Sequence, residues 1–214
     1  MKSLVLLSLL VSAATATGAE PWVCTADGTH LIYGESVGGR ATGTLDKLVT
    51  TGDEGEILLT YTREGLPVVE RWTVHPDSTV LHIEAPEPMY ELLRTMQVED
   101  IEFTARNQSL PAEMNPGDEF PGFGFTLSGR KQNERISVSV VSDRVRVVGR
   151  ERIKTPAGKF EAVRIEYRTT TTMDGTEVES SMTQWLVPGI GVVRQEIPLF
   201  GDMAGVTELQ KIIQ

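Results

Sequence analysis

The feature that most constrains the fold is the stretch from residue 144 to 197, where short alternating segments are separated by turn residues. Apolar residues alternate with charged or polar ones in Val145 and Val147, and again in Val163, Ile165 and Tyr167. A period of two is typical of β-strands with one buried and one wet face. Turns are marked by residues 156–158, 174–175 and 188–189, which contain proline or glycine. The stretch therefore predicts consecutive antiparallel hairpins.

The same alternation extends over most of the chain. It predicts strands at residues 29–37, 42–51, 56–63, 67–75, 79–84, 98–105 and 123–127, one long strand at 135–148 with a bulge or bend at Val140 and Val141, and a last edge strand at 203–213. In the fourth of these strands Glu70 and Trp72 share a face, and Trp72 is the expected anchor. Because the loops are short, strands that follow one another in the sequence are expected to be neighbours in the sheet.

One segment has a different period. Met89, Leu92, Leu93 and Met96 recur at the spacing of one helix face, after a proline-containing start with an acid and before a basic Arg94. The pattern predicts a helix at residues 89–96. The fold expected from these patterns is mainly β: a single domain over residues 20–214, an antiparallel meander in one curved sheet whose open face this short helix would cover.

Two of the turns resemble those of a known family. Thr155-Pro156-Ala157-Gly158-Lys159-Phe160 is followed by Trp185-Leu186-Val187-Pro188-Gly189-Ile190-Gly191-Val192-Val193. This pair resembles the TapB-like family of uncharacterised bacterial exported proteins, and residues 110–118 are similar to a looser upstream marker. Members are similar to lipoprotein-carrier half-barrels. The resemblance implies a half-barrel-like curved antiparallel sheet with the short helix packed on its concave side, but no catalytic residues.

The first nineteen residues have the pattern of a secretory signal peptide. Lys2 is followed by the apolar run of residues 4–11 and then by small residues, so cleavage after Ala16 or after Ala19 fits equally well. We expect an exported protein, periplasmic or extracellular, without stable membrane insertion after signal cleavage. The single Cys24 cannot form an internal disulfide and is expected to be a buried free thiol.

The charge balance disfavours some partners. The chain carries a net charge of −10, and loss of Lys2 with the signal peptide leaves 19 basic residues against 30 acidic ones, a net charge of −11. Such a surface repels phosphate backbones, so nucleic-acid binding is not expected.

Few residues suggest chemistry. Gly34-Glu35-Ser36-Val37-Gly38 fits the G-x-S-x-G pattern of serine hydrolases, but no helix pattern follows it, which that motif requires. His30, His75 and His82 lack metal-ligand spacing. The sequence therefore predicts a protein that is not an enzyme, with no cofactor and no metal, and leaves an esterase using Ser36 as a minor alternative.

The function expected is the binding of an apolar ligand or lipoprotein segment in a half-barrel cleft. The candidate lining residues are Trp72, Leu92, Met96, Phe160, Tyr167 and Trp185. The alternative is a structural or envelope-assembly partner that engages a lipid, a lipoprotein or another envelope protein through an edge strand or its outer face.

Overall fold

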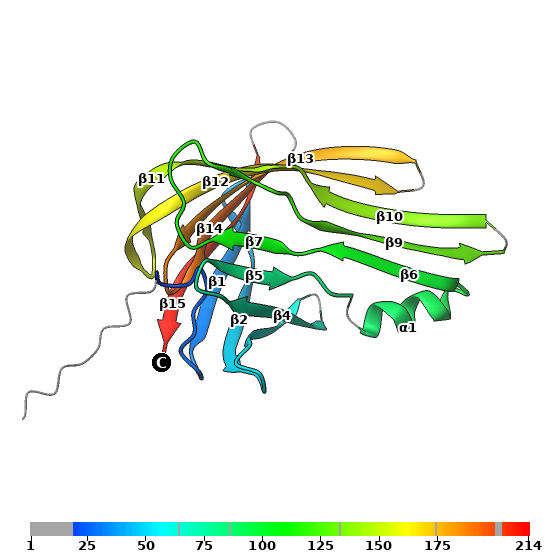
Figure 1. Cartoon of the computed structure of the whole chain (residues 1–214), viewed down its shortest axis with the longest axis horizontal. Coiled ribbons are helices and arrows are strands. Elements are labelled where there is room, and N and C mark those ends of the chain that lie inside the picture. Colours follow the sequence, from blue (N-terminus) through cyan, green and yellow to red (C-terminus); the bar gives the residue numbers. More distant parts are fainter. Residues whose placement is uncertain (1–18, 64, 86, 133, 174, 200–202) are drawn as a thin grey trace, which may run out of the picture.

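The computed structural model describes residues 19–214 except residues 64, 86, 133, 174 and 200–202 (Figure 1). The predicted signal peptide, apart from residue 19, lies outside these residues. In the described part of the chain the structure is one antiparallel sheet of fifteen strands with one short helix, which confirms the predicted fold class.

The strands follow the alternating segments of the sequence closely. The first half of the chain forms β1 His30–Val37, β2 Arg40–Thr51, β3 Ile57–Arg63, β4 Leu66–Val74, β5 Ser78–His82, α1 Glu87–Thr95, β6 Glu99–Arg106 and β7 Gln108–Pro111. The second half forms β8 Glu119–Phe120, β9 Gly124–Lys131, β10 Glu134–Ser142, β11 Val145–Thr155, β12 Gly158–Met173, β13 Thr176–Val187, β14 Gly191–Pro198 and β15 Ala204–Ile213. The sheet order is β6-β9-β10-β12-β13-β14-β15-β1-β2-β3-β4-β5-β7, with β11 between β12 and β8.

The sheet curls into a nearly closed barrel. Its seam lies between β7 and β11, where the backbone N–H of Gly117 donates to the carbonyl of Val147 at 2.9 Å. Trp22 packs beside the β7 side of this seam, since its Nε1 donates to the carbonyl of Pro111 at 2.7 Å and its backbone N–H donates to Oγ1 of Thr79 at 3.1 Å. These two bonds hold the segment before β1 against β5 and β7.

The long strand β12 belongs to two parts of the molecule. Residues 158–166 pair with β11 in the barrel, and residues 169–173 pair with β10. Beyond that point β6, β9, β10 and the outer halves of β12 and β13 extend away from the barrel as a projecting sheet (Figure 1), which we call the arm.

The hydrophobic core fills the barrel. Its fully buried side chains include Trp22, Leu31, Val49, Leu110, Met114, Val145, Val147, Val163, Ile165, Leu186 and Leu209. Burial of one such large side chain stabilises the folded state by about 1.5–3 kcal/mol. The free thiol of Cys24 is buried beside them, as predicted.

The helix forms at nearly the predicted residues, but it lies in a different part of the fold. Glu87 in its first turn and Arg94 in its last turn suit the helix dipole and form an ion pair at 3.2 Å. Yet α1 lies beside β6 at the far end of the arm (Figure 1), and none of its described side chains joins the barrel core. Packing on the concave side is therefore wrong, because barrel side chains already fill that space.

Two strand predictions also need correction. Residues 135–148 form two strands, β10 and β11, because the chain breaks at Asp143 and passes from the arm to the barrel. The expected edge strand at residues 203–213 is β15, which lies inside the sheet between β14 and β1. Leu209 in β15 is fully buried for that reason.

Candidate binding site in the barrel

The inward faces of β1 to β4 change from apolar to polar along the barrel. In β3 the inward side chains are Ile57 and Leu59, then Tyr61 and Arg63. In β4, Glu70 lies two residues before the buried Trp72 and on the same face of the strand. Because side chains two residues apart share a face, this order places polar groups inside the barrel. One end of the lumen is therefore apolar and the other carries charge.

A cavity of about 160 Å³ lies where the two ends meet, and we call it the lumen cavity. Its apolar wall consists of Leu45, Trp72, Leu81, Leu110, Leu186 and Val192. Its polar wall consists of Tyr33, Lys47, Tyr61, Arg63, Glu70, Gln108, Gln184, Gln195 and Thr207. It is smaller than the 300–1,000 Å³ or so of pockets for drug-sized ligands.

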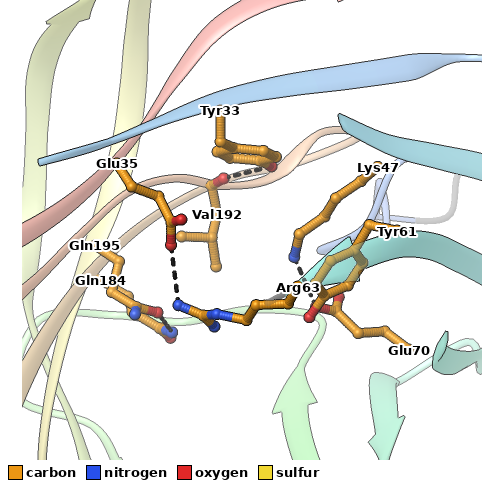
Figure 2. A network of polar contacts seen from close by, with 9 residues as sticks. All are labelled: Tyr33, Glu35, Lys47, Tyr61, Arg63, Glu70, Gln184, Val192 and Gln195. Atoms are coloured by element: carbon orange, nitrogen blue, oxygen red, sulfur yellow. Dashed lines mark hydrogen bonds and ion pairs between the residues drawn. The ribbon is translucent and has the colours of Figure 1, made fainter. Parts of the chain in front are cut away.

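Lys47 and Glu70 form the centre of the polar wall (Figure 2). The Lys47 Nζ lies 2.6 Å from Oε1 of Glu70, and the Tyr61 hydroxyl donates to the same oxygen at 3.0 Å. The ammonium of Lys47 also lies 4.7 Å from the ring centroid of Tyr61 and 5.5 Å from that of Tyr33. Two aromatic rings and one carboxylate thus hold the ammonium, which has further N–H groups to donate.

The two tyrosines stay neutral over a wide pH range. Burial raises the pKa of Tyr33 well above its usual value, and the nearby carboxylate of Glu70 raises it further. Burial and the contact with Glu70 likewise raise the pKa of Tyr61. The Tyr33 hydroxyl donates to the carbonyl of Val192 at 2.9 Å, which fixes its ring against β14 (Figure 2).

The rim of the cavity carries a second set of polar contacts. Arg63 donates to Oε1 of Glu35 at 2.9 Å, and the side-chain amide of Gln184 donates to that of Gln195 at 2.8 Å. Together with Lys47 and Glu70, these residues give two cations and two anions. The charges of these four residues sum to zero, in contrast to the acidic chain as a whole.

Trp72, which lines the lumen cavity, has an indole N–H without a hydrogen-bond partner in the described part of the chain. Its indole is buried, and its Nε1 is one of two such buried side-chain atoms among the described residues. A buried donor left unpaired costs about 1–3 kcal/mol.

The predicted lining residues do not form one site. Of the six, Trp72 lines the lumen cavity, while Phe160 lies half-buried against the core and Tyr167 borders a separate surface hollow. Trp185 donates from Nε1 to Glu151 at 2.6 Å on the outer side of β13. Met96 is 46% exposed near the helix, and the side chain of Leu92 lies outside the described part. Whether any of them contacts a ligand stays a prediction.

Sequence reasoning missed Lys47, Tyr61 and the role of Glu70. One signal was available, since Glu70 shares a face with the anchor Trp72. A charged residue on a buried face indicates either an ion pair or a site. Its partner on β2 is not visible in the pattern, because Lys47 also suits a solvent-facing position.

The residues considered for catalysis or metal binding lie elsewhere. Ser36 is inside β1, paired with Ala41 and Val206 of neighbouring antiparallel strands, so its setting is not a strand-to-helix elbow. His75 and His82 both contact Oγ1 of Thr73, at 3.3 and 3.0 Å. Among the described residues no group of histidine, cysteine or acidic side chains is suited to hold a metal ion.

These features define a class: a nearly closed antiparallel barrel with one short helix and a small, partly polar cavity. The chain belongs to the DUF3108-like family, whose sequence model matches residues 74–198. No sequence among the curated proteins matches the chain.

Two solved structures are similar over most of the chain. One is a Bacteroides fragilis protein with a YmcC-like fold that is predicted to be exported; it is 18% identical with a TM-score of 0.64, over 91% of this chain and 100% of that chain. The other is a predicted lipoprotein of Parabacteroides distasonis, 14% identical with a TM-score of 0.60, over 91% of this chain and 99% of that one. At these identities the likeness shows the fold. In the described residues no helix is long and apolar enough to cross a membrane.

Proposed function

We propose that the protein is an exported binding protein, without a reaction of its own, whose ligand carries an apolar chain ending in a hydrogen-bond acceptor. The observation that carries this proposal is the lumen cavity, where an apolar wall meets the ammonium of Lys47 and where Trp72, whose indole N–H has no partner among the described residues, is part of the lining. Buried donors are normally paired, and we take the indole of Trp72 as the group that meets an acceptor of the bound ligand.

The cavity walls define the chemistry of the ligand. Leu45, Leu81 and Leu186 offer apolar contact on one side, and the ammonium of Lys47 offers donors on the other. A carboxylate or carbonyl at the end of an aliphatic chain matches both. The Lys47 ammonium favours a carboxylate, because a charged hydrogen bond is roughly twice as strong as a neutral one.

The cavity volume limits how much of the ligand enters. About 160 Å³ accepts the end of one chain, with the remainder leaving past the rim at Arg63. A lipid or lipoprotein segment therefore binds through one chain end only. The expected half-barrel cleft is replaced in this proposal by a narrow, half-polar cavity, since the core fills the rest of the barrel interior.

Export is part of the same proposal. It is supported by the signal-peptide pattern at residues 1–19 and by the two structural relatives, one predicted to be exported and the other predicted to be a lipoprotein. We also propose the narrower TapB-like assignment, because both turn motifs on which it depends, at residues 155–160 and 185–193, fall within the matched family region.

The proposal can be tested by calorimetric titration. The probes are straight-chain carboxylates of increasing length, with the primary alcohol of each length for comparison. Trp72→Phe removes the donor and keeps a ring, and Trp185→Phe is the matched control on the outer face. We expect the carboxylates to bind more tightly than the alcohols, and Trp72→Phe to weaken binding by roughly tenfold or more.

Two outcomes would contradict the proposal. One is the absence of binding for all chain lengths by the wild-type protein. The other is equal weakening by Trp72→Phe and Trp185→Phe, which would mean that the cavity donor has no special role. Thermal unfolding of each variant establishes that it is folded before its affinity is compared.

A further inference from the structure

The arm has one apolar face and one polar face. The strand register aligns Phe103, Leu127, Val138 and Met173 in one row and Ala105, Phe125, Val140, Thr171 and Val178 in the next. The alternate positions form a row of hydroxyl groups, Thr104, Thr126, Ser139 and Thr172, that ends at Glu177. Residues directly opposite each other point to the same side of a sheet. Each of the two apolar rows includes an exposed side chain near the outer edge: Met173, 55% exposed, in the first row and Val178, 61% exposed, in the second.

The arm has two sheet edges, and they differ in protection. Its β6 edge carries a register irregularity between Glu99 and Glu102, a positive φ at Asp100, and helix α1 beside it (Figure 1). A bulge is one of the devices that block the pairing of an edge with a foreign strand.

The other edge has no such irregularity among the described residues. In the described part of the chain, residues 176–182 of β13 pair with β12 alone, because pairing with β14 begins at Thr183. This segment contains no proline, no lysine or arginine, and no register irregularity. Its outward backbone groups are therefore available to a further strand.

The side chains of this edge indicate the chemistry of that strand. Glu177 and Glu179 are exposed, lie opposite Thr172 and Thr170, and have no ion-pair partner in the described part of the molecule. Val178 lies between them on the apolar face. A strand that matches this edge would carry cationic residues beside the two acids and apolar residues beside Val178.

A second copy of the chain fits this edge poorly. Antiparallel pairing centred on Val178 would place Glu177 opposite Glu179 of the other copy, and pairing centred on Glu179 would place two copies of that acid together. Like charges directly opposite each other destabilise a strand pair. A basic partner is instead attracted by the two acids and by the chain's net charge of −10.

We propose that residues 176–182 of β13 form a docking edge for an extended polypeptide segment in which lysine or arginine alternates with apolar residues. The segment continues the arm sheet by one strand. The backbone supplies the hydrogen bonds, and Glu177, Val178 and Glu179 select the sequence. This interaction is independent of the lumen cavity.

The test uses a short synthetic peptide that alternates valine and lysine, with both ends blocked. Two comparison peptides have the same residues in two blocks, or glutamate in place of lysine. Binding is measured by fluorescence anisotropy, and the site by amide hydrogen exchange of the full protein. We expect the alternating basic peptide to bind about tenfold more tightly than the block peptide and to protect amides at residues 176–182.

A charge exchange keeps the test independent of folding defects. The double variant Glu177→Lys and Glu179→Lys is expected to lose the basic peptide and to bind the alternating acidic one. The matched control, Glu99→Lys with Glu102→Lys on the β6 edge, is expected to retain the wild-type preference. The proposal is overturned if the block peptide binds equally well, if protection appears elsewhere, or if the β13 variant gains no affinity for the acidic peptide.

Discussion

Lys47 and Glu70 form an ion pair inside the barrel, with 2.6 Å between Nζ and Oε1, and their side chains are only 17% and 21% exposed. Arg152 and Glu161 form a pair of nearly equal length, 2.7 Å, but their side chains are 75% and 69% exposed. The two pairs therefore offer the same contact in different surroundings. Burial, and not distance, determines what each contributes to stability.

The first prediction concerns this difference. Glu70→Gln keeps the size of the side chain but leaves the ammonium of Lys47 without its counter-charge, so we expect a loss of about 1–3 kcal/mol in the free energy of unfolding. Glu161→Gln at the exposed pair should change it by less than about 0.5 kcal/mol. Urea denaturation of both variants measures the two values. Equal effects would mean that the lumen is better solvated than its geometry indicates.

The second prediction concerns alkaline pH. Burial raises the pKa of both Tyr33 and Tyr61 in the folded protein, whereas a tyrosine of the unfolded chain ionises near its ordinary pKa of about 10. Above that pH the unfolded state loses protons that the folded state keeps, so the free energy of unfolding should fall as the pH rises. Tyr33→Phe should make this fall less steep. An identical slope in the variant would contradict the buried, neutral state of Tyr33.

The third prediction concerns the crossover between arm and barrel. A Cβ atom at Gly122 would lie 1.8 Å from the carbonyl oxygen of Asp143 and 2.1 Å from that of Ser142. Because both are backbone atoms, Gly122→Ala should cost about 3 kcal/mol or more or prevent folding. At Gly149 a Cβ would meet no atom within 4 Å, so Gly149→Ala should change stability by about 1 kcal/mol or less. Thermal unfolding of the two variants tests the contrast.

The fourth prediction concerns the seam of the barrel. Trp22 is 2% exposed and its side-chain Nε1 donates to the carbonyl of Pro111, so Trp22→Ala should cost about 3–5 kcal/mol. Met96→Ala, at a site 46% exposed, should cost less than about 0.5 kcal/mol. Hydrogen exchange should show the loss of protection in β7 and β11 in the first variant. Protection that is unchanged there would mean that the seam does not depend on Trp22.

The strands were predictable wherever alternation and turn residues agree. The hairpins of β11 to β14 and of β1 to β5 follow the period of two and short loops, which are local properties of the chain. The helix was predictable for the same reason, since the spacing from Met89 to Met96 is local. Of the site, only Trp72 was visible, as a large apolar residue on a buried face.

The sequence by itself determined which residues form strands, which form the helix, and which faces are apolar. Only the tertiary structure decided that β15 pairs with β1 and so joins the two ends of the chain in one sheet, that β12 is shared by barrel and arm, and that Lys47 meets Glu70. The reason is physical. A repeating pattern fixes the conformation of a segment and its buried side, but the partner of a strand depends on distant residues that the pattern does not identify.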